Sequence, residues 1–245
     1  MLKSYLKRIS EVAKREEMPK LKDELTEKDF RKLVLVSNTK MRKKFKDSFS
    51  NEIESFIKAV FLTYKSWKLI DESCKGDKQK SHTSAFLFNA INNLVNSSNL
   101  LISGYLVASG NLMRHFMESS AMAILVSSKN LGYSKRFEKD GNKFPVHKSL
   151  ILVSKDWNKL GIKRENWDDF VKLKKFYDLS SHSSAFALAS IFNFSRKDGI
   201  AIGPHFDSAK LRAYRKEIKL RISAAECLKN IICGIRHIQS EDYHP

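Results

Sequence analysis

The segment from Ser81 to Ser128 is almost free of charge. Arg114 and Glu118 are its only charged residues, whereas 29% of all residues in the chain are Asp, Glu, Lys or Arg. Within this segment, Leu100 to Val126 is apolar on nearly every side of a helical projection. Such a helix is stable in water only when other elements cover it all round. The sequence therefore predicts a bundle of helices packed around this central one.

The rest of the chain favours the same architecture. It contains only nine Gly and four Pro, so long stretches run uninterrupted by residues that break helices. We expect an all-α protein with a basic N-terminal helical arm over residues 1–50 and a helical bundle over residues 51–245. The turn pair Asp198-Gly199 lies between two short apolar runs, a pattern typical of a small β-hairpin.

A strong excess of positive charge points to a polyanionic partner. Lys and Arg number 45 against 27 acidic residues, which gives a formal net charge of +18. Nucleic acid is the leading candidate, because neutralising phosphates releases counterions. An acidic protein, an anionic membrane surface and a merely solvated basic face are the alternatives. The cations concentrate in residues 40–46 and on the outer face of the last helix, where we also place Lys210 and Arg221. The predicted nucleic-acid-binding residues are Lys40, Arg42, Lys43, Lys44, Lys46, Arg212, Arg215, Lys216 and Lys219.

Four residues are candidates for catalysis: Arg114, Glu118, Tyr177 and His182. Arg114 and Glu118 are four positions apart, so they share one face of the central helix. Either Arg114 contacts a phosphate and Glu118 holds it in place, or the two form a structural ion pair. His182 lies among four serines at an expected helix junction, where an imidazole could move protons during RNA cleavage. The alternative is a capping loop in which His182 donates to a backbone carbonyl.

Several other chemistries lack their sequence patterns here. There is no His-Glu-x-x-His motif, no Cys pair at zinc spacing and no glycine-rich phosphate loop, so we predict neither a metal nor a cofactor. Three cysteines without pairing and no secretory signal favour a cytoplasmic location. Arg114, His115 and Glu118 interrupt the longest apolar run, which argues against stable membrane insertion. A basic amphipathic helix over Met1–Arg15 leaves peripheral membrane attachment as an alternative.

Three short motifs occur in a distinctive order before a long basic helix. They are Ser103-Gly104-Tyr105 with Arg114-x-x-x-Glu118, then Tyr177-Asp178-Leu179-Ser180-Ser181-His182, then Ile202-Gly203-Pro204-His205-Phe206-Asp207. In this order they resemble bacterial proteins of unknown function related to HEPN domains, over roughly Asn51 to Gln239. The resemblance implies a helical bundle of toxin or phage-defence type, with Arg114, Glu118 and His182 at the matching polar positions.

The same resemblance implies RNA rather than DNA as the partner, together with a homodimer or a protein partner. Active HEPN domains cut RNA without a metal and place a His one helical turn or more after an Arg. This chain differs, because Arg114-His115 and Arg236-His237 are adjacent pairs. We therefore expect an RNA-interacting protein that is either a metal-independent ribonuclease or a non-catalytic binding or scaffolding module.

Overall fold

The structure is a computed structural model that describes residues 31, 38–160, 164–181, 187–188, 192–195 and 203–239. The chain divides into two compact units, Met1–Ser37 and Asn38–Pro245. The first unit, which includes the amphipathic helix predicted for Met1–Arg15, lies almost wholly outside the described residues. His182 and the hairpin predicted at Asp198-Gly199 also lie outside them.

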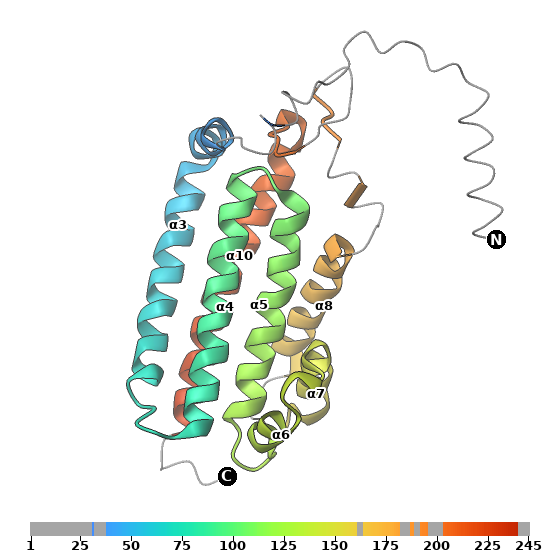
Figure 1. The fold of residues 1–245 in the computed structure, drawn as a ribbon. Coiled ribbons are helices and arrows are strands. Elements are labelled where there is room, and N and C mark those ends of the chain that lie inside the picture. Colours follow the sequence, from blue (N-terminus) through green and yellow to red (C-terminus); the bar gives the residue numbers. More distant parts are fainter. Residues whose placement is uncertain are drawn as a thin grey trace, which may run out of the picture. The chain divides into compact units, whose positions relative to one another are not determined.

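The second unit is a bundle of long helices (Figure 1). Helix α5 contacts α4 and α8, and α10 packs on α3. Shorter helices cover the end of α5 opposite to its N-terminus (Figure 1). None of the described residues belongs to a strand, which confirms the predicted all-α class. The long helices are α3 (Thr39–Asp71), α4 (Lys78–Ile102), α5 (Leu106–Ser127), α8 (Arg164–Ser181) and α10 (Leu211–Gln239), and the short ones are α6 (Tyr133–Asp140) and α7 (Ser149–Asp156).

The predicted boundary at residue 50 lies inside helix α3. Helix α3 consists of two helical segments that meet in a kink at Phe49, where the backbone is non-helical with a φ of −142°. Phe45 and Phe49 are buried and pack with Leu101 and Tyr214 in a small apolar cluster. The compact unit that contains these side chains begins at Asn38, and the boundary at residue 50 stays a prediction.

The central position of α5 agrees with its apolar sequence, but the helix starts later than predicted. Every residue from Phe116 to Ser127 is buried. The expected helix from Leu100 is interrupted at residues 103–105, where Gly104 adopts a φ of +89°. A Cβ atom at Gly104 would lie 2.8 Å from the backbone nitrogen of His205, so only glycine fits both the conformation and the space. The chain therefore turns back here and forms an α4–α5 hairpin.

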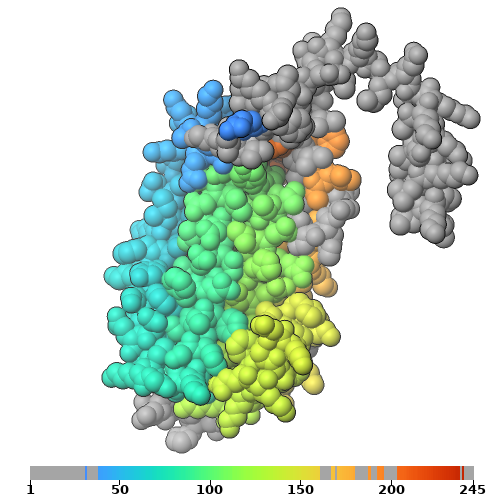
Figure 2. Space-filling model, viewed as in Figure 1, coloured from blue at the N-terminus to red at the C-terminus, as the bar shows by residue number. Residues whose placement is uncertain are grey.

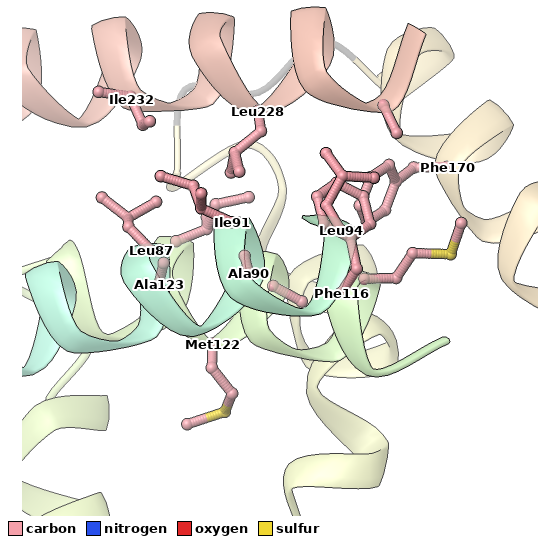
Figure 3. Close-up of a cluster of buried hydrophobic side chains, with 14 of the residues drawn as sticks. Leu87, Ala90, Ile91, Leu94, Phe116, Met122, Ala123, Phe170, Leu228 and Ile232 are labelled. Carbon is pink, nitrogen blue, oxygen red and sulfur yellow. The ribbon is translucent and has the colours of Figure 1, made fainter. Parts of the chain in front are cut away.

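The main apolar core contains side chains of all five long helices and of α6 and α7, and Figure 3 shows part of it. On one side of the molecule, side chains of α3, α4 and α5 close the gaps between the ribbons and largely hide α10 (Figure 2). Within the described ranges, no helix has the length and apolar character that crossing a bilayer requires. The labelled core side chains are Leu87, Ala90, Ile91 and Leu94 of α4, Phe116, Met122 and Ala123 of α5, Phe170 of α8, and Leu228 and Ile232 of α10.

Candidate nucleic-acid interface

Arg114 and Glu118 meet on α5, and α8 supplies a second carboxylate. Arg114 Nε donates to Glu118 Oε1 at 3.0 Å and lies 3.4 Å from Asp178 Oδ1. Lys174 Nζ in turn lies 2.8 Å from Asp178 Oδ2. The Glu118 side chain is 7% exposed and that of Arg114 is 25% exposed. The charge of Arg114 is thus balanced by two carboxylates, although a quarter of its side chain stays exposed.

Tyr177, the other candidate catalytic residue that the structure describes, contacts a different carboxylate. Tyr177 is buried, and its hydroxyl donates to Glu217 Oε2 at 3.0 Å. Burial and the neighbouring Glu217 raise the pKa of Tyr177 far above its ordinary value, although Arg221 acts in the opposite direction. His115 is exposed, and its Nδ1 lies 3.6 Å from Glu118 Oε2. His115 is therefore the described imidazole nearest to the pair.

Arg221 is an interior residue, which corrects our placement of it on the outer face of α10. Its side chain is 1% exposed, and Nη1 lies 2.6 Å from Glu217 Oε2. Nε donates to Ser97 Oγ at 3.1 Å and Nη2 donates to Ser109 Oγ at 2.6 Å. The burial is explained by position, because residue 221 falls on the apolar stripe of α10 between Ile218 and Ala225. That periodicity was the signal in the sequence that could have identified it.

The outer face of the first part of α10 forms an open basic depression, which we call the α10 groove. Its volume is about 860 Å³. Arg215 Nε donates to Glu52 Oε1 at 2.8 Å. For the other three predicted cations of α10, no carboxylate of the described residues lies within ion-pair distance. The residues lining the α10 groove are Phe194, Ala209, Lys210, Arg212, Ala213, Arg215, Lys216, Lys219, Leu220 and Ser223.

The basic run of α3 lies at the same end of the bundle as the start of α10. Phe45, inside this run, has its ring centroid 4.9 Å from that of Tyr214. Arg42 forms hydrogen bonds at the C-terminal end of α4. Its Nη1 donates to Ser103 Oγ at 3.0 Å, and its Nη2 donates to Asn99 Oδ1 at 3.3 Å. The fold therefore brings together two cation clusters that are far apart in the sequence. The remaining cations of the run, Lys40, Lys43, Lys44 and Lys46, are exposed.

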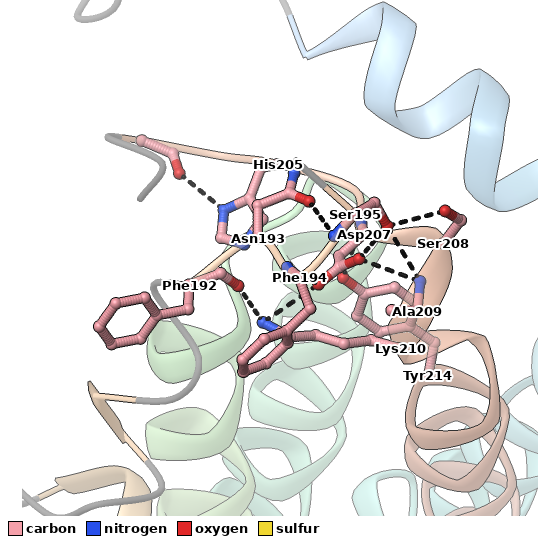
Figure 4. Close-up of polar contacts among 11 residues, drawn as sticks. Phe192, Asn193, Phe194, Ser195, His205, Asp207, Ser208, Ala209, Lys210 and Tyr214 are labelled. Carbon is pink, nitrogen blue, oxygen red and sulfur yellow. Dashed lines mark hydrogen bonds and ion pairs between the residues drawn. The ribbon is translucent and has the colours of Figure 1, made fainter. Parts of the chain in front are cut away.

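Buried Asp207 attaches residues 192–195 to the start of α10 (Figure 4). Its carboxylate accepts hydrogen bonds from the backbone NH of Phe194 at 2.8 Å, from the backbone NH of Ala209 at 3.0 Å, and from Ser195 Oγ. Burial raises the pKa of Asp207, but the hydrogen bonds and the charge of Lys210 outweigh it and leave the pKa below its ordinary value. The carboxylate thus stays charged and fixes Phe194 beside the groove.

Comparisons with other proteins add no assignment to this geometry. The chain matches no family model, no curated protein and no solved structure. The HEPN resemblance therefore stays a prediction. Among the described residues, no group of three or more His, Cys, Asp or Glu side chains is placed to hold a metal ion. Function has to be inferred from the chain's own residues and their positions.

Proposed function

We propose that the protein binds RNA in the α10 groove. The observation that supports this most directly is the row of Arg212, Lys216 and Lys219 on successive turns, which faces an open depression and has no carboxylate of the described residues within ion-pair distance. Cations that are not neutralised within the protein can neutralise phosphates, and each such contact releases counterions. The exposed lysines at the start of α3 extend the positive charge at this end of the bundle.

Charge reversal in the groove tests the proposal. The triple variant Arg212→Glu, Lys216→Glu, Lys219→Glu should bind labelled RNA much more weakly. The slope of log affinity against log salt concentration should also be smaller in magnitude by about 2, because about 0.7 is lost for each of three single-strand phosphate contacts. Fluorescence anisotropy at several salt concentrations measures both quantities.

A matched control separates the groove from net charge alone. Lys129, Lys139 and Lys155 are exposed and lie toward the α6–α7 end of the bundle (Figure 1). The triple variant Lys129→Glu, Lys139→Glu, Lys155→Glu changes the net charge by the same amount, and we expect its affinity and salt dependence to stay close to the wild-type values. Equal losses in the two triple variants would contradict binding in the groove.

Metal-independent RNA cleavage is a second candidate function. It is favoured by one observation: the partly exposed side chain of Arg114 and the exposed imidazole of His115 both lie against the carboxylate of Glu118. Against it, Arg114 Nε already contacts Glu118 and Asp178. Incubation of the protein with labelled RNA in the presence of a chelator tests the activity. Cleavage that Arg114→Ala and His182→Ala both abolish would support a ribonuclease. If the wild-type protein leaves the RNA intact, RNA cleavage is wrong and RNA binding is the only function that remains proposed.

The cleavage experiment needs a control for folding, because Arg114→Ala leaves buried Glu118 without its nearest cation. Circular dichroism spectra and thermal melts of each variant provide that control. Arg114→Lys retains the charge but not the planar guanidinium. A catalytic guanidinium therefore predicts that Arg114→Lys is folded but inactive, whereas a structural ion pair predicts that it is folded and active.

A further inference from the structure

A large aromatic side chain stands exposed at the edge of the α10 groove. Phe194 is 64% exposed and is one of the residues that line the groove. Lys210 Nζ lies 5.1 Å from the centroid of its ring. The ring centroid of Phe192 lies 6.4 Å from that of Phe194, and the angle between the two ring planes is 25°. Two exposed aromatic rings with nearly parallel planes therefore adjoin the row of cations.

Hydrogen bonds hold Phe194 in this exposed position. The backbone NH of Phe194 donates to buried Asp207, and Lys210 Nζ donates to the carbonyl of Phe192 (Figure 4). Ser195 Oγ contacts both Asp207 and Ser208, the latter at 2.8 Å. Exposure of the ring leaves much of its apolar surface in water, so the arrangement adds little to folding stability. A ligand that covers the ring would gain from finding it already in place.

We propose that Phe194 stacks on an unpaired base and makes the α10 groove selective for single-stranded over double-stranded RNA. The inference rests on the proposed function, since it assumes RNA in this groove. Cations bind the phosphates of either form, but the bases of a duplex are stacked on one another and offer no free face within the helix. A single strand can place one base on an aromatic ring while its backbone follows the positive charges.

The test uses substitutions at Phe194 and an equally exposed control. Phe61 on α3 is 58% exposed and has Lys65 Nζ 5.8 Å from its ring centroid, but it is not among the residues lining the groove. Phe194→Ala should weaken binding of a single-stranded oligonucleotide of about twelve nucleotides by about 5- to 150-fold. Phe61→Ala should leave this affinity unchanged, and neither variant should alter binding of a duplex.

Two further variants distinguish stacking from apolar contact. Phe194→Trp should bind the single strand at least as tightly as wild type, because indole offers a larger stacking surface. Phe194→Leu keeps an apolar side chain without a ring and should behave like Phe194→Ala. A 2-aminopurine base in the single strand should lose fluorescence on binding to wild type and regain it with Phe194→Leu.

The outcomes separate this inference from the proposed function. If the charge-reversed groove variant loses RNA while Phe194→Ala and Phe194→Leu bind like wild type, stacking is wrong and binding in the groove stands. Equal weakening of single-stranded and duplex RNA by Phe194→Ala also overturns the inference. If the wild-type protein binds neither form, both the inference and the proposed function fail.

Discussion

Individual residues show how burial, more than sequence spacing, determines the role of a charge. Arg114 was identified from its apolar surroundings, and it does meet Glu118 as the four-residue spacing predicts. Arg221 was assigned to the outer face of the last helix together with the exposed cations around it, yet it is the more deeply buried arginine. Sequence alone could not supply its partners, since Ser97 and Ser109 come from two other helices.

Loss of Arg221 should destabilise the protein more than loss of any surface arginine. Arg221→Ala leaves Glu217 without its closest cation and Ser97 and Ser109 without their donor, so we expect a loss of about 3–5 kcal/mol in the free energy of unfolding. Arg215→Ala removes an exposed pair with Glu52 and should cost about 1 kcal/mol or less. Urea unfolding followed by circular dichroism measures both, and similar losses would contradict the structural role of Arg221.

Asp207 should contribute to stability at neutral pH and lose that contribution in acid. Its pKa is lowered in the folded protein, so its stabilising effect is present above its ordinary pKa and is lost as the pH falls through the folded value. At about pH 7 the wild-type protein should therefore unfold at a higher urea concentration than Asp207→Asn. The difference between the two unfolding midpoints should become smaller below about pH 4. A gap that is constant over this range would show that the charge of Asp207 is not what stabilises the fold.

At the scale of elements, periodicity predicted the helices well and their ends poorly. The apolar pattern identified α5 as the central helix, but it did not show that residues 103–105 separate α4 from α5. The reason is a long-range contact, because Gly104 faces the backbone of His205, about a hundred residues later in the chain. The end of a predicted helix thus depended on a neighbour that local sequence could not reveal.

Gly104→Ala should destabilise the α4–α5 turn. The added methyl group would meet the His205 backbone, and a φ of +89° is unfavourable for alanine, so we expect a loss of about 1–3 kcal/mol. Gly234 provides the control, since a Cβ there meets nothing within 4 Å and the residue lies inside α10. Gly234→Ala should raise the melting temperature slightly by increasing helix propensity. A neutral Gly104→Ala would contradict the close packing at this turn.

At the scale of the whole molecule, the fold gives the excess positive charge a location. Composition predicted a polyanionic partner, and the sequence pattern predicted that the cations concentrate in residues 40–46 and on the outer face of the last helix. The packing of Phe45 against Tyr214 shows that these cations lie at the same end of the bundle. The exposed ring of Phe194 was likewise invisible to sequence analysis, because hydrogen bonds to Asp207 position it beside α10.

Photochemical cross-linking tests the location of RNA on the protein most directly. A single-stranded RNA containing 4-thiouridine is irradiated with the full chain, and the modified peptides are identified by mass spectrometry. The account predicts cross-links to residues 192–195 and to residues 210–219, with loss of both in the Arg212→Glu, Lys216→Glu, Lys219→Glu variant. Cross-links confined to α5 and α8 around Arg114, or to the α6–α7 end of the bundle, would contradict it.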